Sequence, residues 1–203
     1  FSLYCRNIKK LAFSFMIKKY QNIWKLAVKY LKKGINKNFV IHTEGVVKAM
    51  DLILKKEKGD PDILIPAAML HDVGWARVPK KYQRTKNKEN KLRGMKLHIE
   101  MAPEIIKKIL KELNYKDFQV KEIIEIVQAH KFKKPRKLNK QMLIDADQLA
   151  DAFKEQFYSD VKAYNQTPEN QYNFRIKDNN FYTKVAKDIF WEQMQKRKSE
   201  NNF

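Results

Sequence analysis

The amino-acid sequence predicts an all-α protein, a single-domain helical bundle of about eight helices. Glycine and proline are scarce, with 5 Gly and 6 Pro in 203 residues, whereas Lys, Glu, Ile and Leu dominate long stretches. These residues favour helices. Apolar residues recur at helical spacing, and no alternating strand pattern, internal repeat or domain-scale linker is present. A chain of this length suits one domain with a sizeable core.

In the first half of the chain, the spacing predicts amphipathic helices over residues 17–33 and about 40–56. Asp60 as N-cap and Pro61 at the first helical position begin a third helix. Residues 75–96 are polar, with few residues suited to a core. We expect them to form a mobile surface loop with one short helix.

In the second half, apolar periodicity predicts four further helices separated by turn-prone segments. The expected helices cover residues 98–113, 117–130, 139–164 and 181–198. Residues 165–180 are expected to be turns, and residues 199–203 to fray. The aromatic side chains near the C-terminus are expected to pack on the core.

The net charge of +20 reflects 36 Lys and only 7 Arg, and the lysines are spread over nearly every predicted helix. Arginine is the residue whose fork reads phosphates and bases with defined geometry. We therefore interpret the charge as compositional bias and solubility, and no nucleic-acid partner is expected. The alternative is a basic field that attracts anionic ligands.

The single Cys5 cannot form an internal disulfide, which favours a reducing, cytoplasmic setting. Residues 11–17 are apolar but too short to span a membrane, and no small-residue cleavage site follows them. No membrane association is expected. The chain begins with Phe1, and Met16 is a candidate native start.

His71 and Asp72 are adjacent at the end of an apolar segment and are followed by Gly74. Neighbours on a helix point about 100° apart, so both reach one centre only where the backbone leaves the helix. Gly74 is expected to permit that turn. Imidazole nitrogen and carboxylate oxygen together are typical ligands of catalytic zinc, iron or manganese rather than of a sealed structural zinc site.

The chain contains four histidines, each at or near the end of a predicted helix and about thirty residues apart: His42, His71, His98 and His130. Such spacing lets them converge at one end of a bundle. Asp145 and Asp147 interrupt the apolar face of a later helix. Asp147 shares the stripe of Leu143, and a carboxylate that points at a helical core needs a cation or hydrogen-bond donors.

This order of His, His-Asp, His, His and Asp resembles the HD-domain superfamily of metal-dependent phosphohydrolases. Residues 65–74 are similar to the apolar helix of that family that ends in HD-[IVL]-G, and residues 145–149 resemble its closing Asp-Ala-Asp-x-Leu element. The resemblance implies that His42, His71, Asp72 and Asp147 hold the core metal. It also implies that His98 and His130 serve a second metal, with Asp72 bridging the two.

The resemblance implies three segments. Residues 1–37 would be an N-terminal extension with the first helix, residues 38–165 the HD-domain core, and residues 166–203 a C-terminal helical segment packed on the core. Two absences narrow the subclass. The Glu-Asp pair that alarmone hydrolases carry shortly after the His-Asp pair is missing after His71-Asp72. No GYP motif follows His130, which argues against a cyclic-di-nucleotide phosphodiesterase of that type. Trp75 stands where many members carry a substrate-binding Lys.

The implied function is a metal-dependent phosphohydrolase acting on a nucleotide or other small phosphate ester through a metal-activated water. The cofactor would be one or two divalent ions of Mn, Fe, Zn, Co or Ni. Asp72 and Asp147 are the expected catalytic residues, and the candidate substrate-binding cations are Arg77, Arg93 and Lys131. The alternatives are a di-iron oxygenase that cleaves a C–C or C–P bond, and a basic helical binding module without catalysis. The sequence gives no oligomeric state.

Overall fold

The computed structural model describes residues 18–35, 38–83, 85–177 and 180–202. Within these ranges it is all-helical and contains no strand, which confirms the predicted fold class. The elements are α2 (Gln21–Leu31), α3 (Phe39–Leu54), α4 (Pro61–Leu70), η1 (Val73–Arg77), η2 (Lys80–Tyr82), α5 (Lys88–Glu112), α6 (Asp117–Val127), α7 (Leu138–Ala150), α8 (Lys154–Ala163), α9 (Pro168–Lys177) and α10 (Lys184–Asn201). Cys5, Met16 and the apolar segment 11–17 lie outside the described residues.

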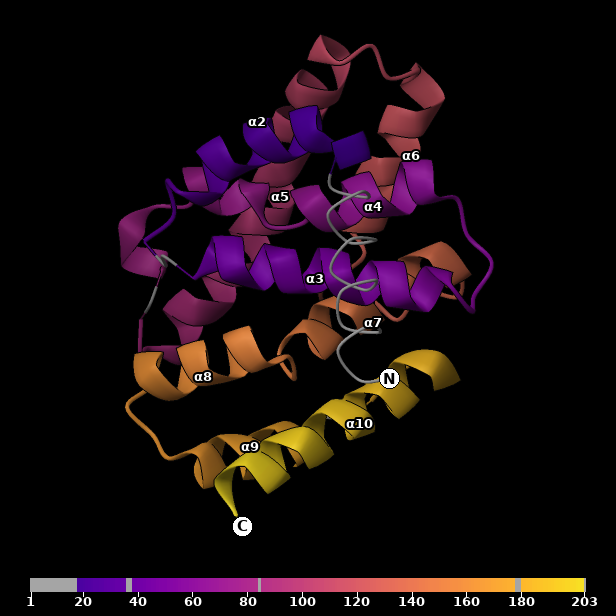
Figure 1. Ribbon diagram of the computed structural model, residues 1–203. Helices are drawn as coiled ribbons and strands as arrows, with labels where there is room; N and C mark the ends of the chain where they lie inside the picture. The colour runs from indigo at the N-terminus through magenta and orange to yellow at the C-terminus, as the bar shows by residue number, and fades with distance from the viewer. Residues whose placement is uncertain (1–17, 36–37, 84, 178–179, 203) are drawn as a thin grey trace.

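Helix α4 lies at the centre of the molecule and contacts α2, α3, α6 and α7 (Figure 1). Its sequence is apolar on every side, and the residues from Ile63 to Leu70 are all buried. A helix that is hydrophobic all round belongs inside a protein. Asp60 caps its start by accepting a hydrogen bond from the Asp62 backbone at 2.8 Å. The central helix therefore carries the His71-Asp72 pair into the interior.

The prediction of a mobile loop over residues 75–96 is wrong for most of that segment. It contains most of η1, all of η2 and the first turns of α5, which begins at Lys88 rather than near residue 98. Asn87 caps this longer helix, because its side chain accepts from the Asn90 backbone at 2.9 Å. The early turns of α5 are largely exposed, so they lack the apolar stripe on which the sequence prediction depended.

The single helix predicted over residues 139–164 is two helices, α7 and α8. The backbone amides of Ala152 and Phe153 bond to the carbonyls three residues earlier, at 3.0 and 3.1 Å, which closes a tight turn. Both side chains are buried. The apolar pattern therefore continues through the break, so periodicity alone does not reveal it.

Residues 165–180, expected to be turns, contain α9. Thr167 accepts a hydrogen bond from the Asn170 backbone at 3.2 Å, and Pro168 is the first helical residue. Helix α10 begins at Lys184 rather than 181 because Thr183 is its cap. Helices α9 and α10 lie side by side at one end of the molecule (Figure 1).

None of the described helices has both the length and the apolar character needed to cross a membrane.

Candidate metal centre

The backbone leaves α4 at the His71-Asp72 pair. His71 still has helical backbone angles, whereas Asp72 does not, with φ −106° and ψ 4°. The His71 Nδ1–H donates to the Ala68 carbonyl at 2.8 Å, so that Nε2 points away from the helix. The two adjacent side chains can therefore face one centre, as the sequence predicted.

Gly74 has a different role from the expected one. Among the described residues, no glycine has a left-handed φ, so the turn does not require glycine for its backbone angles. A Cβ on Gly74 would instead lie 1.8 Å from the carbonyl oxygen of His98. Glycine is required here because η1 packs directly on the backbone of α5, which brings Asp72 close to His98.

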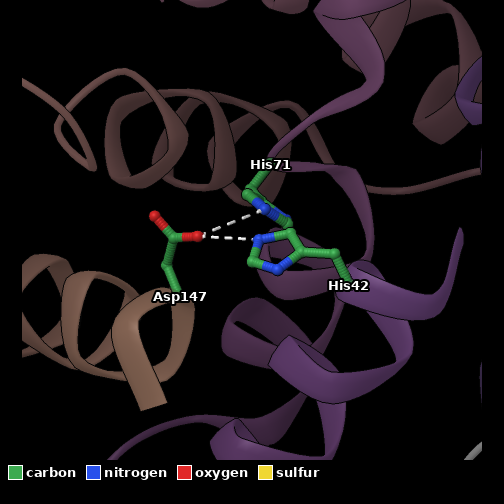
Figure 2. A group of neighbouring side chains, drawn as sticks. All are labelled: His42, His71 and Asp147. Atoms are coloured by element: carbon green, nitrogen blue, oxygen red, sulfur yellow. Dashed lines mark hydrogen bonds and ion pairs between the residues drawn. The ribbon is translucent and has the colours of Figure 1, made fainter. Parts of the chain in front are cut away.

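One group of side chains unites three helices: His42 from the first turn of α3, His71 from the end of α4 and Asp147 from α7 (Figure 2). The Nε2 of His42 lies 2.9 Å from Asp147 Oδ1, and that of His71 lies 3.7 Å from the same oxygen. One potential ligand atom from each residue lies within 4.8 Å of the others.

A second group contains Asp72, His98 and His130, all buried. The Nε2 atoms of the two histidines face each other at 3.3 Å, and Asp72 Oδ1 lies 3.6 Å from His98 Nε2. The other carboxylate oxygen of Asp72 lies 3.4 Å from His71 Nε2, so Asp72 stands between the two groups. All six sequence-predicted ligands are therefore brought together.

The two buried histidines of the second group suit metal binding because they are uncharged. Burial lowers the pKa of His98 to about 4 and that of His130 to about 3. His130 donates its Nδ1–H to the Val127 carbonyl at 2.5 Å, which leaves a lone pair on Nε2. An imidazole in that state is the form that ligates a metal.

The first group also favours a cation. Burial alone would lower the pKa of His42, but Asp147 and Asp151 raise it to about 10. A positive charge is thus stabilised between His42 and Asp147, where a metal could take the place of the proton. His71 Nε2 is buried and lacks a hydrogen-bond partner among the described residues. A nitrogen and oxygen donor set of this kind fits zinc, iron, manganese, cobalt or nickel.

The carboxylates are held in their ionised form. Burial would raise the pKa of Asp72, yet the neighbouring His71, His98 and His42 lower it far below its ordinary value. Asp147 is likewise buried, and Lys131 and His42 keep its pKa well below the usual range. Both side chains therefore remain acceptors that can bind a cation.

Two features around the groups were not predicted. Asp151 lies one helical turn after Asp147, and its Oδ1 is 3.5 Å from His42 Nδ1, a position that orients the ring from behind. The four-residue spacing of Asp147 and Asp151, which places both on one face of the helix, was visible in the sequence. Trp75 stacks on His98, with centroids 4.6 Å apart and planes 6° apart, and Phe39 stacks on its other side at 5.6 Å.

Of the three candidate substrate-binding cations, one reaches the site. Lys131 contacts Asp147, and burial would lower its pKa, but the carboxylates of Asp147 and Asp72 raise it. Arg77 pairs with Glu104 at 2.5 Å and is half exposed. Arg93 is exposed. Neither arginine lines the cavity beside the metal-type side chains.

That cavity has a volume of about 620 Å³. Its walls come from the start of α3, from Trp75 and the first part of α5, from the end of α7, and from α8 and α9. The wall formed by α9 was not predicted, because residues 165–180 were expected to be turns. The polar side chains that α8 and α9 contribute to the cavity are Gln156, Asp160, Gln171 and Arg175. Gln156 and Asp160 are four residues apart, as are Gln171 and Arg175, and this spacing places each pair on one face of a helix. That spacing was the signal available in the sequence.

The fold and these groups define a helical domain with two adjoining His/Asp clusters compatible with metal binding. The family model for the HD domain matches residues 39–155, more than half of the chain. The chain therefore belongs to the HD-domain family, whose members are mostly metal-dependent phosphohydrolases. The match includes all six clustered residues and ends before most of α8. Comparisons with curated proteins and with solved structures gave no match.

Proposed function

We propose that this protein is a metal-dependent phosphohydrolase that acts on a nucleotide or another small phosphate ester. The observation that carries the proposal is the pairing of two three-residue groups through one carboxylate. Asp72 lies within 3.4 Å of His71 in one group and 3.6 Å of His98 in the other. This arrangement supports two neighbouring ions that share a bridging ligand.

In this proposal the first ion is held by His42, His71 and Asp147, and the second by His98 and His130, with Asp72 contacting both. A bound divalent metal would supply Lewis acidity, which polarises a phosphoryl oxygen and lowers the pKa of water. The buried, ionised carboxylates and the neutral imidazoles of His98 and His130 are donors that such an ion needs, and the first ion would take the place of the proton on His42.

The protein groups have separate tasks. The Oδ1 atom of Asp147 faces His42, while its Oδ2 faces Lys131. In this proposal Oδ2 accepts a proton from the attacking water after Lys131 has turned to the phosphate. Lys131 lines the cavity and carries a charge that would steady the phosphoryl oxygens as negative charge builds up. Trp75 and Phe39 form an apolar wall that limits access of bulk water.

The same six ligands would also suit a di-iron pair that activates oxygen, which makes an HD-type oxygenase the second candidate. A basic binding module without catalysis is the third. Metal analysis of anaerobically purified protein, together with a phosphate-release assay on a panel of nucleotides and sugar phosphates, separates the three. We expect one or two equivalents of a divalent ion and release of phosphate. Two equivalents of iron with oxygen-dependent turnover would overturn the hydrolase proposal.

The Asp72→Ala variant tests the site itself. We expect it to lose bound metal and phosphate release while its helical circular-dichroism signal stays near the wild-type level. Asp188→Ala is the matched control, since Asp188 is an exposed residue of α10 that pairs only locally with Lys184. The control should keep its metal. Full metal content in Asp72→Ala would show that the assigned ligands are wrong.

A further inference from the structure

The far end of the cavity, between α8 and α9, is built from buried polar side chains that belong to neither metal-type group. Gln156 and Asp160 come from α8 and are each 6% exposed, and Gln171 from α9 is 1% exposed. Arg175 on α9 completes this end. Burying polar groups costs free energy unless they find hydrogen-bond partners. We refer to these four residues as the α8–α9 subsite.

The hydrogen bonds within the α8–α9 subsite leave one acceptor and one donor unused. Asp160 accepts from Gln156 Nε2 at 2.8 Å and from Arg175 Nη2 at 2.5 Å. Because the amide nitrogen of Gln156 must face that carboxylate, its oxygen Oε1 is fixed on the opposite side. Gln156 Oε1 and Arg175 Nε are buried and have no hydrogen-bond partner among the described residues. Both residues line the cavity, so a ligand with donors and acceptors would meet side chains whose hydrogen-bonding capacity is not fully used.

The charge of the subsite opposes a second anion. Arg175 is already paired with two carboxylates, Asp151 at 2.6 Å and Asp160 at 2.5 Å. Among the described residues that line this end of the cavity, Arg175 is the one Lys or Arg, and both carboxylates already occupy it, although the net charge of the chain is +20. An additional phosphate or carboxylate placed here would find no unpaired cation and would lie beside two carboxylates. A hydroxyl, amide or amine group needs no such cation.

An aromatic edge adjoins the polar groups. Tyr164 and Phe174 also line the cavity, and both are more than half exposed. The Arg175 guanidinium lies 5.4 Å from the centre of the Phe174 ring. Flat aromatic faces favour contact with a sugar or a ring system. The subsite thus combines hydrogen bonding, a cation already paired with carboxylates and an apolar edge.

We propose that the α8–α9 subsite selects phosphate monoesters whose organic part forms several hydrogen bonds and bears no negative charge. The phosphate would lie at the metal groups beside Lys131, and the organic part would extend toward Gln156 and Arg175. Sugar monophosphates and nucleoside monophosphates have this chemistry, whereas bisphosphates, diphosphates and phosphorylated acids do not. This inference deepens the proposed phosphohydrolase function and depends on it.

Matched substrates test the inference on the unaltered, metal-loaded protein. Glycerol 3-phosphate and 3-phosphoglycerate differ by one carboxylate at the end away from the phosphate. We expect kcat/KM to be at least tenfold higher for glycerol 3-phosphate, and the same preference for a nucleoside monophosphate over its diphosphate. Equilibrium dialysis of the metal-loaded protein with non-hydrolysable phosphonate analogues of these nucleotides gives a readout without turnover and should rank them in the same order. Equal values within each pair would overturn the inference.

Methyl phosphate separates failure of this inference from failure of the proposed function, because its single methyl group does not reach the subsite. If methyl phosphate is hydrolysed but the matched pairs are not distinguished, only the subsite assignment is wrong. If no phosphate ester is hydrolysed, the proposed function fails. A variant adds a local test: Gln156→Met should lower the kcat/KM of glycerol 3-phosphate relative to that of methyl phosphate about tenfold. Gln195→Met, at an exposed position of α10, should leave that ratio unchanged.

Discussion

Replacing Gly74 with alanine tests how closely the site depends on the contact between η1 and α5. The added Cβ would lie 1.8 Å from the His98 carbonyl oxygen, 2.8 Å from the His98 carbonyl carbon and 3.0 Å from the Ala102 nitrogen. Ordinary contacts lie at about 3.5 Å, so the two elements must separate by roughly 1.7 Å. All three atoms are backbone and cannot rotate away.

We expect Gly74→Ala to destabilise the protein by about 3 kcal/mol, the upper end of the cost of overpacking a core. For a domain of this size that corresponds to a melting temperature roughly 6–12 °C lower. The shift would also move Asp72 relative to His98, so metal affinity measured by calorimetric titration should fall even at temperatures where the variant is folded. Thermal unfolding followed by circular dichroism measures the first effect.

Gly45→Ala is the matched control on α3. There the new Cβ would lie 3.1 Å from the Ala150 Cβ and 3.6 Å from the Ala150 Cα and carbonyl oxygen, and alanine gains about 1 kcal/mol of helix propensity. Its melting temperature should stay within about 3 °C of the wild-type value. If Gly74→Ala behaved like this control, the close packing of η1 on α5 would not be what places Asp72 beside His98.

Two further predictions concern the supports of the site. Trp75→Leu removes the ring stacked at 4.6 Å on His98 and should weaken binding of the second metal equivalent about tenfold, as loss of an outer-shell partner does. In a calorimetric titration the first equivalent should be unaffected, and equal weakening of both would contradict the stacking role. Asp145→Ala leaves three donors just before α10 without their acceptor: the part-buried backbone amide of Tyr182, and the buried backbone amide and hydroxyl of Thr183. Urea unfolding should show a loss of about 3 kcal/mol with an unchanged m-value, whereas a loss below about 1 kcal/mol would contradict the anchoring role.

The sequence predicted the fold class because helical periodicity is strong wherever a helix has one buried face. It failed where that signal is absent or misleading. The first turns of α5 are mostly exposed and lack the stripe, so they resembled a loop. At Ala152 and Phe153 the opposite holds: both are buried, and the apolar pattern continues across a turn that ends α7. Tertiary packing, not local preference, determines that break.

The prediction for the site was more complete than the prediction for the helix boundaries. The six metal-type residues were identified from their order, and the model brings them into two groups joined at Asp72. Their role as ligands stays a prediction. The outer residues were harder to find, because their function depends on partners distant in sequence. The role of Arg175 depends on its ion pairs with Asp151 and Asp160. Those pairs form because Arg175 lies on α9, a helix that was not predicted from the sequence.

The charge of the cavity differs from that of the whole chain. Four carboxylates line it together with Lys91, Lys131, Arg175 and His42, whose pKa the neighbouring carboxylates raise to about 10. The charges of the cavity are therefore close to balanced, while the excess of lysine lies elsewhere on the molecule. Such a field draws anions toward the protein, and divalent ions at the metal groups would favour entry of a phosphate into the cavity. The lysine-rich surface would then govern how fast a phosphate ester arrives, the metal groups would determine whether it binds, and the α8–α9 subsite would select its organic part.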